Sequence, residues 1–435
     1  MHSAAWDKNA DWKGKTVAVL GCGSSGVQIV PTIQPGLSFP IISDDNPLIS
    51  LSFQRLNSSS PSLGHRRGSR QVSRKAKQVP GDPTSRVCTQ FKPFRDYHVD
   101  NISVSDEQKE TFRKDPAEHL RYRKEIEAEL NSRFKFIIKD SPEQAEAVRF
   151  STNEMKTKLG HNSPLLKHLI PTFSVGCRRP TPGNGYLEAL TEKNVRVVTD
   201  RIAEIVPEGI KTETGEIIKI DMFICATGFD ISFCPRYPVI GRNGIGLADM
   251  WKEKPAAYLS LAVPNVPNHF SEYPCDLRYL TDYNNLTIVV FLGPNAPIGH
   301  GSVLPIVEHA AKYIIRMLHK CQTQDIKAVT VKQAAVDDFD EHVQTFMKRT
   351  AWTTHCRSWF KNGKIEGPVV ALHPGSRVHW FHMLDEPRYE DYEWERLNSN
   401  RFSYLGNGFS VKEAEGKDST YYFDNPDEGY ESVRY

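Results

Sequence analysis

The sequence lacks features that define several large classes of protein. No stretch approaches about 18 consecutive apolar residues, so no segment has the composition of a membrane-spanning helix. The formal net charge is only +2, whereas a dedicated nucleic-acid binder needs a much larger basic excess. The first 15 residues contain no apolar segment like that of a secretory signal peptide. These absences predict a cytoplasmic protein with no membrane span and no nucleic-acid partner.

Closely spaced cysteines are also absent. The eight cysteines are scattered along the chain, and none forms a CxxC pair or joins histidines at metal-ligand spacing. The sequence therefore predicts free thiols in a reducing compartment and no metal site. The 435 residues, of which 39% are hydrophobic and 25% charged, are typical of a globular protein with two or three domains.

A glycine-rich turn stands between a predicted strand and a predicted helix. The apolar run KTVAVLG at 15–21 indicates a buried strand, and a helix is predicted at about 24–33. The residues between them have GxGxxG spacing, which is a weak motif alone and a stronger one between a strand and a helix. These residues are Gly21, Cys22, Gly23, Ser24, Ser25 and Gly26.

Each glycine of this turn has a physical reason in a dinucleotide site. The first, Gly21, makes the tight turn, Gly23 lets the backbone approach a pyrophosphate, and Gly26 lets the helix pack closely on the strand. The first helical residues, Ser24 and Ser25, present N–H groups and the positive end of the helix dipole to the phosphates. The pattern predicts dinucleotide binding, and the alternative is a turn that serves packing alone.

The identity of the dinucleotide depends on the end of the second strand. An NAD site places an acid there, about 20 residues on. Here the apolar run PLISLSF, at 47–53, is followed by Gln54 and Arg55. A guanidinium suits the 2′-phosphate of NADPH because it donates paired hydrogen bonds. Arg55 is therefore a candidate NADPH ligand, or else an ordinary exposed arginine, since its spacing is about ten residues too long.

The remaining patterns alternate helices with strands. Residues 36–104 are rich in Ser, Pro, Arg and Lys and are expected to be loop or disorder, whereas 105–158 have helical periodicity. Further predictions are a capping box of Ser105 with Gln108, short strands over 194–225 with a hairpin turn at Gly215, and helices at about 302–320 and 332–349. Together these patterns predict an α/β fold with a parallel sheet.

Six segments, taken in order, are more specific than any single motif. They are GKTVAVLGCGSSGVQIVPTIQP, VGCRRPTPGNGYLEAL, ICATGFDISFCPRYPVIGRNG, FLGPNAPIGHGS, CRSWFKNG and NRFSYLGNGFS. With them the chain resembles the flavin-containing monooxygenase superfamily, and most of all the fungal Baeyer–Villiger monooxygenases. The resemblance covers about residues 12–35, 105–270 and 291–412.

In that family a first glycine turn binds FAD and a second, internal turn binds NADPH. The segments that follow Gly21 are those that follow the NADPH turn, and only 20 residues precede Gly21. The resemblance therefore implies that the front FAD-binding lobe is missing. It implies an NADPH-binding Rossmann-like domain with a helical insertion at 12–35 and 105–225, an atypical segment at 36–104, the C-terminal part of an FAD-binding domain at 226–412 with an atypical insertion at 271–290, and a tail at 413–435.

The resemblance assigns roles to two neighbouring arginines. Arg179 matches the family's active-site arginine, whose fixed cation stabilises an anionic flavin C4a-peroxide and the oxyanion of its adduct with a ketone. Arg178 matches a basic position that contacts the NADPH 2′-phosphate. The alternative for both is a solvated pair of arginines before a proline.

Further cofactor contacts follow from the same resemblance. They are Ala226, Thr227 and Gly228 at a strand end, Gly293, Pro294, Asn295, Gly301 and Ser302 beside the flavin ring, and Trp359 near the nicotinamide ribose. In this interpretation Ser302 begins a helix whose positive end faces the ring. The alternatives are an ordinary strand end, a glycine-rich loop before an N-capped helix, and a core tryptophan.

The activity that the resemblance implies is NADPH- and FAD-dependent oxygenation of a ketone to an ester or lactone. The partners would be molecular oxygen and a small organic substrate, and the family's range includes steroids, cyclic ketones and fungal secondary metabolites. The family fingerprint FxGxxxHxxxW is absent before the glycine turn. An N- or S-oxygenating flavin monooxygenase therefore remains an alternative, as does a catalytically inactive NADPH-binding remnant. The sequence indicates neither the substrate nor the oligomeric state.

Overall fold

The computed structural model describes residues 1–37, 39–43, 51–52, 104–181, 183–270, 272–273, 288–289 and 291–423. The chain divides into two compact units, each assembled from segments that are separate in the sequence. Unit 1 comprises Met1–Glu110, Arg149–Thr172 and Thr181–Phe229, and unit 2 comprises Thr111–Val148, Phe173–Pro180 and Asp230–Tyr435. Most of the predicted helical insertion thus belongs with the C-terminal part of the chain and not with the glycine turn.

Unit 1 is built on a three-stranded parallel sheet in the order β2-β1-β8. Its strands are β1 (Thr16–Leu20), β2 (Phe39–Ser43) and β8 (Met222–Cys225). The predicted first strand and the parallel pairing are therefore confirmed. The central strand β1 is apolar without alternation, and its residues Val17, Ala18 and Val19 are fully buried, as expected for a strand covered on both faces.

The prediction of the strand that follows α1 is wrong. The neighbour of β1 is β2, at Phe39–Ser43, and not the run at 47–53 that precedes Arg55. The apolar FPIIS run is the first available after the helix, and short connections are favoured between neighbouring elements. Within 47–53, only β3 (Leu51–Ser52) is described, and it pairs antiparallel with β4 (Arg196–Val197). Part of the 36–104 segment therefore forms strands, and Arg55 lies outside the described residues.

The helix predicted after the glycine turn is α1 (Ser24–Ile33). It buries Gly26, Val30 and Ile33 in a core with Val17, Val19 and Ile224 of the sheet. The antiparallel strands β5 (Ile202–Val206), β6 (Gly209–Thr212) and β7 (Ile217–Lys219) follow in the same unit. The predicted turn at Gly215, whose φ is +88°, joins β6 to β7 and is confirmed.

The predicted helical segment forms α2 (Asp106–Lys114), α3 (Pro116–Ser132) and α4 (Pro142–Leu159). The capping box before α2 is confirmed, because the Gln108 N–H donates to Ser105 Oγ at 3.1 Å and the Ser105 N–H donates to Gln108 Oε1 at 3.0 Å. The side chain of Asp115 caps α3 by accepting from the N–H groups of Ala117 and Glu118. None of the helices in the described ranges is long and apolar enough to cross a membrane.

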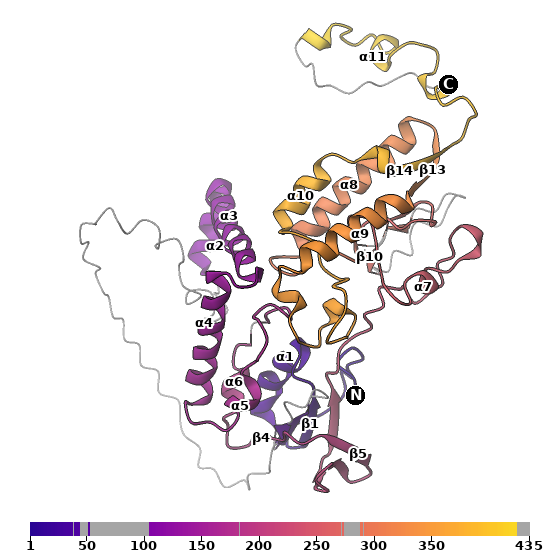
Figure 1. Ribbon diagram of the computed structural model, residues 1–435. Helices are drawn as coiled ribbons and strands as arrows, with labels where there is room; N and C mark the ends of the chain where they lie inside the picture. The colour runs from indigo at the N-terminus through magenta and orange to yellow at the C-terminus, as the bar shows by residue number, and fades with distance from the viewer. Residues whose placement is uncertain are drawn as a thin grey trace. The chain divides into compact units, whose positions relative to one another are not determined.

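Unit 2 contains the other two predicted helices, α8 (Leu304–Thr323) and α9 (Gln333–Met347). In this unit α8 packs against α10 (Arg377–Asp385) and against β13 (Ile326–Val331), which pairs antiparallel with β14 (Tyr392–Arg396) (Figure 1). The apolar residues of α8 that face this core recur at helical spacing, as the sequence predicts. They are Ile306, Ala310, Tyr313, Ile314 and Met317.

Short elements complete the described residues. They are α5 (Leu166–Leu169), α6 (Tyr186–Ala189), α7 (Leu247–Met250), α11 (Val411–Ala414), β9 (His269–Phe270), β10 (Glu272–Tyr273), β11 (Ile288–Val289) and β12 (Phe291–Leu292). Single turns of 3-10 helix lie at Gln34–Gly36, Arg133–Ile137, Arg242–Gly244, Ala351–Thr353, Trp359–Lys361, Tyr389–Asp391, Ser403–Leu405 and Tyr421–Phe423.

Candidate functional site

The glycine turn of unit 1 uses its three glycines in two different ways. A Cβ atom on Gly21, whose φ is +109°, would overlap the carbonyl oxygen of Ala226, and one on Gly26 would overlap the carbonyl oxygen of Gly21. These two glycines are therefore required by packing. A Cβ atom on Gly23 would meet no described atom within 4 Å. The backbone is thus closely packed at Gly21 and Gly26, whereas the space beside Gly23 is open.

The N-terminus of α1 lies at this open position. The first hydrogen bond of the helix runs from the Val27 N–H to the Gly23 carbonyl at 3.0 Å. The N–H groups of Ser24, Ser25 and Gly26 precede this bond and have no acceptor within the helix. The first turn of α1 contains no acidic residue. Free N–H groups, a positive helix end and open space suit an anion, so the residues present fit a pyrophosphate.

The strand-end motif after β8 closes one side of the turn. The Ala226 N–H donates to the Leu20 carbonyl at 2.7 Å, and Ala226 is buried against Gly21. The hydroxyl of Thr227 lies 3.2 Å from His2 Nε2, and Gly228 has a φ of +108°. The structure thus brings Ala226 together with the glycine turn, while a direct contact of Thr227 or Gly228 with a cofactor stays a prediction.

In unit 2 the guanidinium of Arg179 is bound to a glycine-containing loop. It donates to the carbonyl of Ile298 at 2.7 Å and to that of Gly301 at 2.9 Å. Burial lowers the pKa of Arg179 from its ordinary value, although a guanidinium remains charged in proteins. These two bonds fix the orientation of the guanidinium. Two residues predicted to serve one site, Arg179 and Gly301, are therefore in direct contact.

The beginning of this loop is anchored to neighbouring backbone. Gly293, Pro294 and Asn295 are all buried. The carbonyl of Gly293 accepts from Ser260 Oγ at 3.1 Å, and the side-chain amide of Asn295 donates to the Leu372 carbonyl at 3.2 Å. These contacts give the segment a fixed shape, and its approach to a flavin ring stays a prediction.

The start of α8 corrects the prediction made for Ser302. The helix begins at Leu304, and its N-cap is Val303, which has no side chain able to cap it. Gly301 has a φ of +75°, which lies outside the helical region, and the Ser302 carbonyl accepts from Arg377 Nη1 at 3.1 Å. Because that carbonyl is turned toward Arg377, Ser302 belongs to the loop and not to the helix.

Two residues of this site were given no individual role from the sequence. Arg377 is fully buried, and its guanidinium occupies the space that a Cβ atom on Gly301 would need. His300 is also buried, and its Nε2 accepts from the Arg377 backbone N–H at 3.4 Å. His300 lies within the FLGPNAPIGHGS segment, whose resemblance already places it in the candidate flavin loop. The sequence around Arg377 contains no motif, and its acidic partner, Glu127, is far away along the chain.

A disulfide between Cys177 and Cys356 corrects the prediction that all cysteines are free thiols. The two Cα atoms are 6.6 Å apart, although 179 residues separate the cysteines in the sequence. Spacing along the chain cannot reveal such a pair. Cys225, Cys234 and Cys321 are free thiols as predicted, and Cys88 and Cys275 lie outside the described residues.

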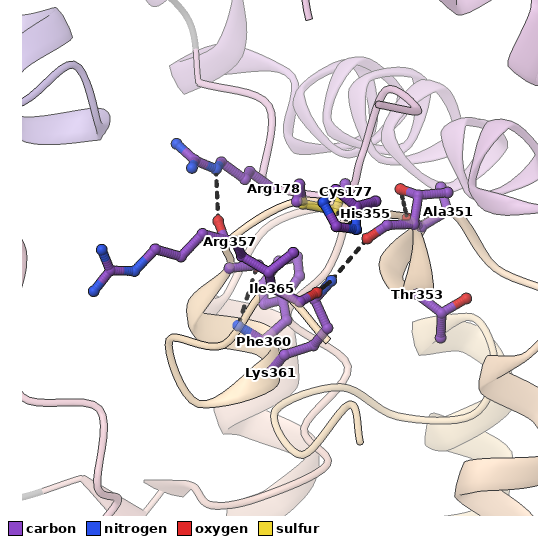
Figure 2. The surroundings of a disulfide bond; sticks show 12 residues. Cys177, Arg178, Ala351, Thr353, His355, Arg357, Phe360, Lys361 and Ile365 are labelled. Atoms are coloured by element: carbon purple, nitrogen blue, oxygen red, sulfur yellow. Dashed lines mark hydrogen bonds between the residues drawn. A yellow bond between two sulfur atoms is a disulfide. The ribbon is translucent and has the colours of Figure 1, made fainter. Parts of the chain in front are cut away.

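The disulfide joins the segment that contains both predicted arginines to the CRSWFKNG segment (Figure 2). Beside it Arg178 Nε donates to the Arg357 carbonyl at 2.8 Å. Half-buried Trp359 packs on Phe360 with ring centroids 4.7 Å apart. Buried Lys361 donates to the Thr354 carbonyl at 2.7 Å. Arg178 and Trp359, both predicted to contact NADPH, thus lie on two segments that a covalent bond connects.

Removal of this disulfide is expected to lower the stability of unit 2. A cross-link that closes so long a loop stabilises a protein by about 2–4 kcal/mol, mainly by restricting the unfolded chain. The variant Cys177→Ser/Cys356→Ser should therefore unfold at lower denaturant concentration than the oxidised protein. Cys234→Ser, which removes a free thiol of the same unit, is the control. Equal unfolding midpoints for the double variant and the oxidised protein would contradict the assignment.

The fold defined by these elements is that of a known class of monooxygenase. No protein-family model matches the chain. A closed crystal structure of cyclohexanone monooxygenase superposes with a TM-score of 0.63 at 20% identity, over 91% of this chain and 70% of that one. The NADP+-bound cyclohexanone monooxygenase of Rhodococcus sp. Phi1 gives 0.63 at 21% identity. The chain therefore has a mixed α/β fold like that of cyclohexanone monooxygenase.

The sequence relatives of the chain are named monooxygenases. The chain is 34% identical over 419 residues to the FAD-binding monooxygenase tazF of Aspergillus terreus, covering 95% of this chain and 64% of that protein. It is 32% identical to the FAD-binding monooxygenase stcW of Emericella nidulans, covering 96% and 60%. A Baeyer-Villiger monooxygenase of Pseudomonas aeruginosa is 25% identical over 86% of this chain and 59% of that protein. The chain is thus similar to FAD-binding monooxygenases over almost all of its residues, and it spans about three fifths of the length of these relatives.

Proposed function

We propose that this chain forms part of an NADPH- and FAD-dependent monooxygenase of Baeyer–Villiger type, which converts a ketone to an ester or lactone. The observation that carries the proposal is the contact of Arg179 with the Ile298 and Gly301 carbonyls, which joins the candidate active-site cation to the candidate flavin loop. The FAD-binding monooxygenases among its relatives, and the solved enzymes with bound FAD and NADP, support both cofactors.

NADPH is assigned to the Rossmann-like glycine turn of unit 1. The N–H groups of Ser24, Ser25 and Gly26 would hold the pyrophosphate over Gly23, where the backbone leaves open space. Arg178 would bind the 2′-phosphate through the parts of its guanidinium that do not bind Arg357. Trp359 would pack against the nicotinamide ribose.

FAD is assigned to the loop of unit 2 that runs from Gly293 to Ser302. A bound flavin supplies the electron transfer and the activation of oxygen, which no side chain can perform. The buried hydrogen bonds at Gly293 and Asn295 hold the shape of this loop, which favours a preorganised site. Arg179 holds a positive charge at this loop in a partly desolvated position, where its effect on developing negative charge is larger than in water.

The reaction type is tested with a ketone panel and an amine panel under ¹⁸O₂, with NADPH and FAD supplied. The proposal predicts esters or lactones that contain one labelled oxygen, and no reaction of the amines. Conversion of the amines to N-oxides, with ketones untouched, would show an N-oxygenating monooxygenase instead. Each assay is repeated without NADPH as the control, and product formation should then stop because the reductant is missing.

A further inference from the structure

We infer that Arg377 is a positioning residue, which holds the loop Gly299–Ser302 against α3 and fixes the hydrogen-bonding state of His300. The consequence of this role for catalysis rests on the proposed function. The structural part of the inference concerns only residues of unit 2 and stands on their contacts alone.

The side chain of Arg377 is bound on three sides. Its Nη2 pairs with Glu127 Oε1 at 2.7 Å, its Nε donates to Asn131 Oδ1 at 2.6 Å, and its Nη1 donates to the Ser302 carbonyl at 3.1 Å. Glu127 and Asn131 belong to α3. A fully buried charge is costly unless it is paired and hydrogen-bonded, so these three partners must be kept together. Arg377 therefore ties α3 and α10 to the loop.

The loop is shaped to receive this guanidinium. Gly301 has a φ of +75°, and a Cβ atom there would collide with the Cζ, Nε and Nη1 atoms of Arg377. Any other residue at position 301 would force the arginine away from the Ser302 carbonyl. The glycine and the buried arginine thus depend on each other.

Two arginines orient successive peptide groups of the loop. The Gly301 carbonyl accepts from Arg179, and the Ser302 carbonyl accepts from Arg377. A trans peptide is planar, so the N–H that shares a peptide group with each carbonyl points the opposite way. The contact with Arg179 therefore sets the direction of the Ser302 N–H, and the contact with Arg377 sets that of the Val303 N–H. The loop presents its donors in directions set by these two side chains.

The same arginine controls His300. The Arg377 backbone N–H donates to His300 Nε2 at 3.4 Å, which requires a lone pair on Nε2 and places the proton of the neutral ring on Nδ1. Burial, with the nearby charges of Arg377 and Arg179, lowers the pKa of His300 to about 4, so the ring is neutral at pH 7. Nδ1 is buried and has no hydrogen-bond partner among the described residues. His300 thus offers an unused N–H donor at the candidate flavin loop.

Three variants test the positioning role. Arg377→Met removes the charge and the donors, Arg377→Lys keeps the charge without the fork, and Glu127→Gln keeps Arg377 but removes its ionic partner. Arg316→Met is the matched control, because Arg316 joins α8 to the Leu384 carbonyl of α10 without touching the loop. Thermal melting identifies the variants that fold, and Glu127→Gln keeps the test available if Arg377→Met does not fold.

The first measurement is hydrogen exchange of peptides that cover residues 293–303 in the full chain without added cofactor. Exchange there should rise by about tenfold or more in Arg377→Met, less in Arg377→Lys and Glu127→Gln, and not in Arg316→Met. Folded variants whose loop exchanges like that of the wild type would overturn the inference. So would an equal rise in Arg316→Met, because it would show a general loss of stability.

The second measurement uses ¹⁵N-labelled histidine, with His300→Gln for assignment. The His300 ring should carry its proton on Nδ1 in the wild type, and Arg377→Lys should preserve this tautomer because the backbone donor remains. A ring protonated on Nε2 in the wild type would also overturn the inference. If the wild type takes up no FAD while loop exchange and tautomer behave as expected, the proposed function fails and the positioning role of Arg377 stands.

Discussion

Alanine in place of Arg179 is expected to lower ester formation by about 10²- to 10³-fold, the usual cost of removing one fixed donor that stabilises transition-state charge. The guanidinium binds two loop carbonyls, at Ile298 and Gly301, so its removal also frees the candidate flavin loop on one side. Arg179→Lys should recover part of the rate, because it restores the charge but not the two-pronged contact. Product formation at saturating NADPH measures the effect.

The neighbouring arginine supplies the control for this experiment. Arg178 binds the Arg357 carbonyl and is assigned to the NADPH 2′-phosphate. Arg178→Ala should therefore raise the KM for NADPH and leave kcat close to that of the wild type. The reverse outcome, a loss of kcat in Arg178→Ala with Arg179→Ala fully active, would show that the roles of the two arginines are exchanged.

Substitutions in the glycine turn should separate packing from cofactor binding. Gly26→Ala is expected to destabilise unit 1 by about 1–3 kcal/mol, because its Cβ atom overlaps the Gly21 carbonyl and must push α1 away from β1. Gly23→Ala should leave the melting temperature unchanged, since its Cβ atom enters open space and its φ of −72° suits alanine.

The same Gly23→Ala variant should bind NADPH about 10- to 100-fold more weakly, if the methyl group displaces the pyrophosphate from one charge-assisted hydrogen bond. Fluorescence titration with NADPH measures this change, and thermal melting of both variants gives the stability effects. Wild-type affinity in Gly23→Ala would place the pyrophosphate elsewhere and leave the glycine turn as a packing device.

Local patterns predicted most of the elements around the glycine turn. The strand β1, the helix α1, the capping box of Ser105 with Gln108 and the turn at Gly215 each depend on residues within a few positions of one another. Such features are encoded in short windows, where hydrophobic periodicity and backbone preferences act directly. The resemblance to the monooxygenase family, which its relatives confirm, placed Arg179 and Gly301 in one site, and the structure shows them in contact.

Contacts between distant segments were not predictable in this way. The disulfide joins residues 179 positions apart, and the Glu127–Arg377 pair connects α3 to α10. Nothing in the local sequence distinguishes a buried arginine from an exposed one. The neighbour of β1 was also misplaced, because two apolar runs follow α1 and only the three-dimensional pairing selects between them. The contact of the Ser302 carbonyl with Arg377, just before the helix start at Leu304, also joins residues that are far apart in the sequence.

The absorption spectrum of the purified chain, recorded without oxygen before and after addition of NADPH, shows whether the protein binds a flavin that NADPH reduces. We predict flavin absorbance, either as purified or after incubation with FAD and removal of the excess, and loss of that absorbance on addition of NADPH. A colourless protein that takes up no FAD and still binds NADPH would contradict this prediction, and would identify the chain as a nicotinamide-dinucleotide binder without flavin chemistry.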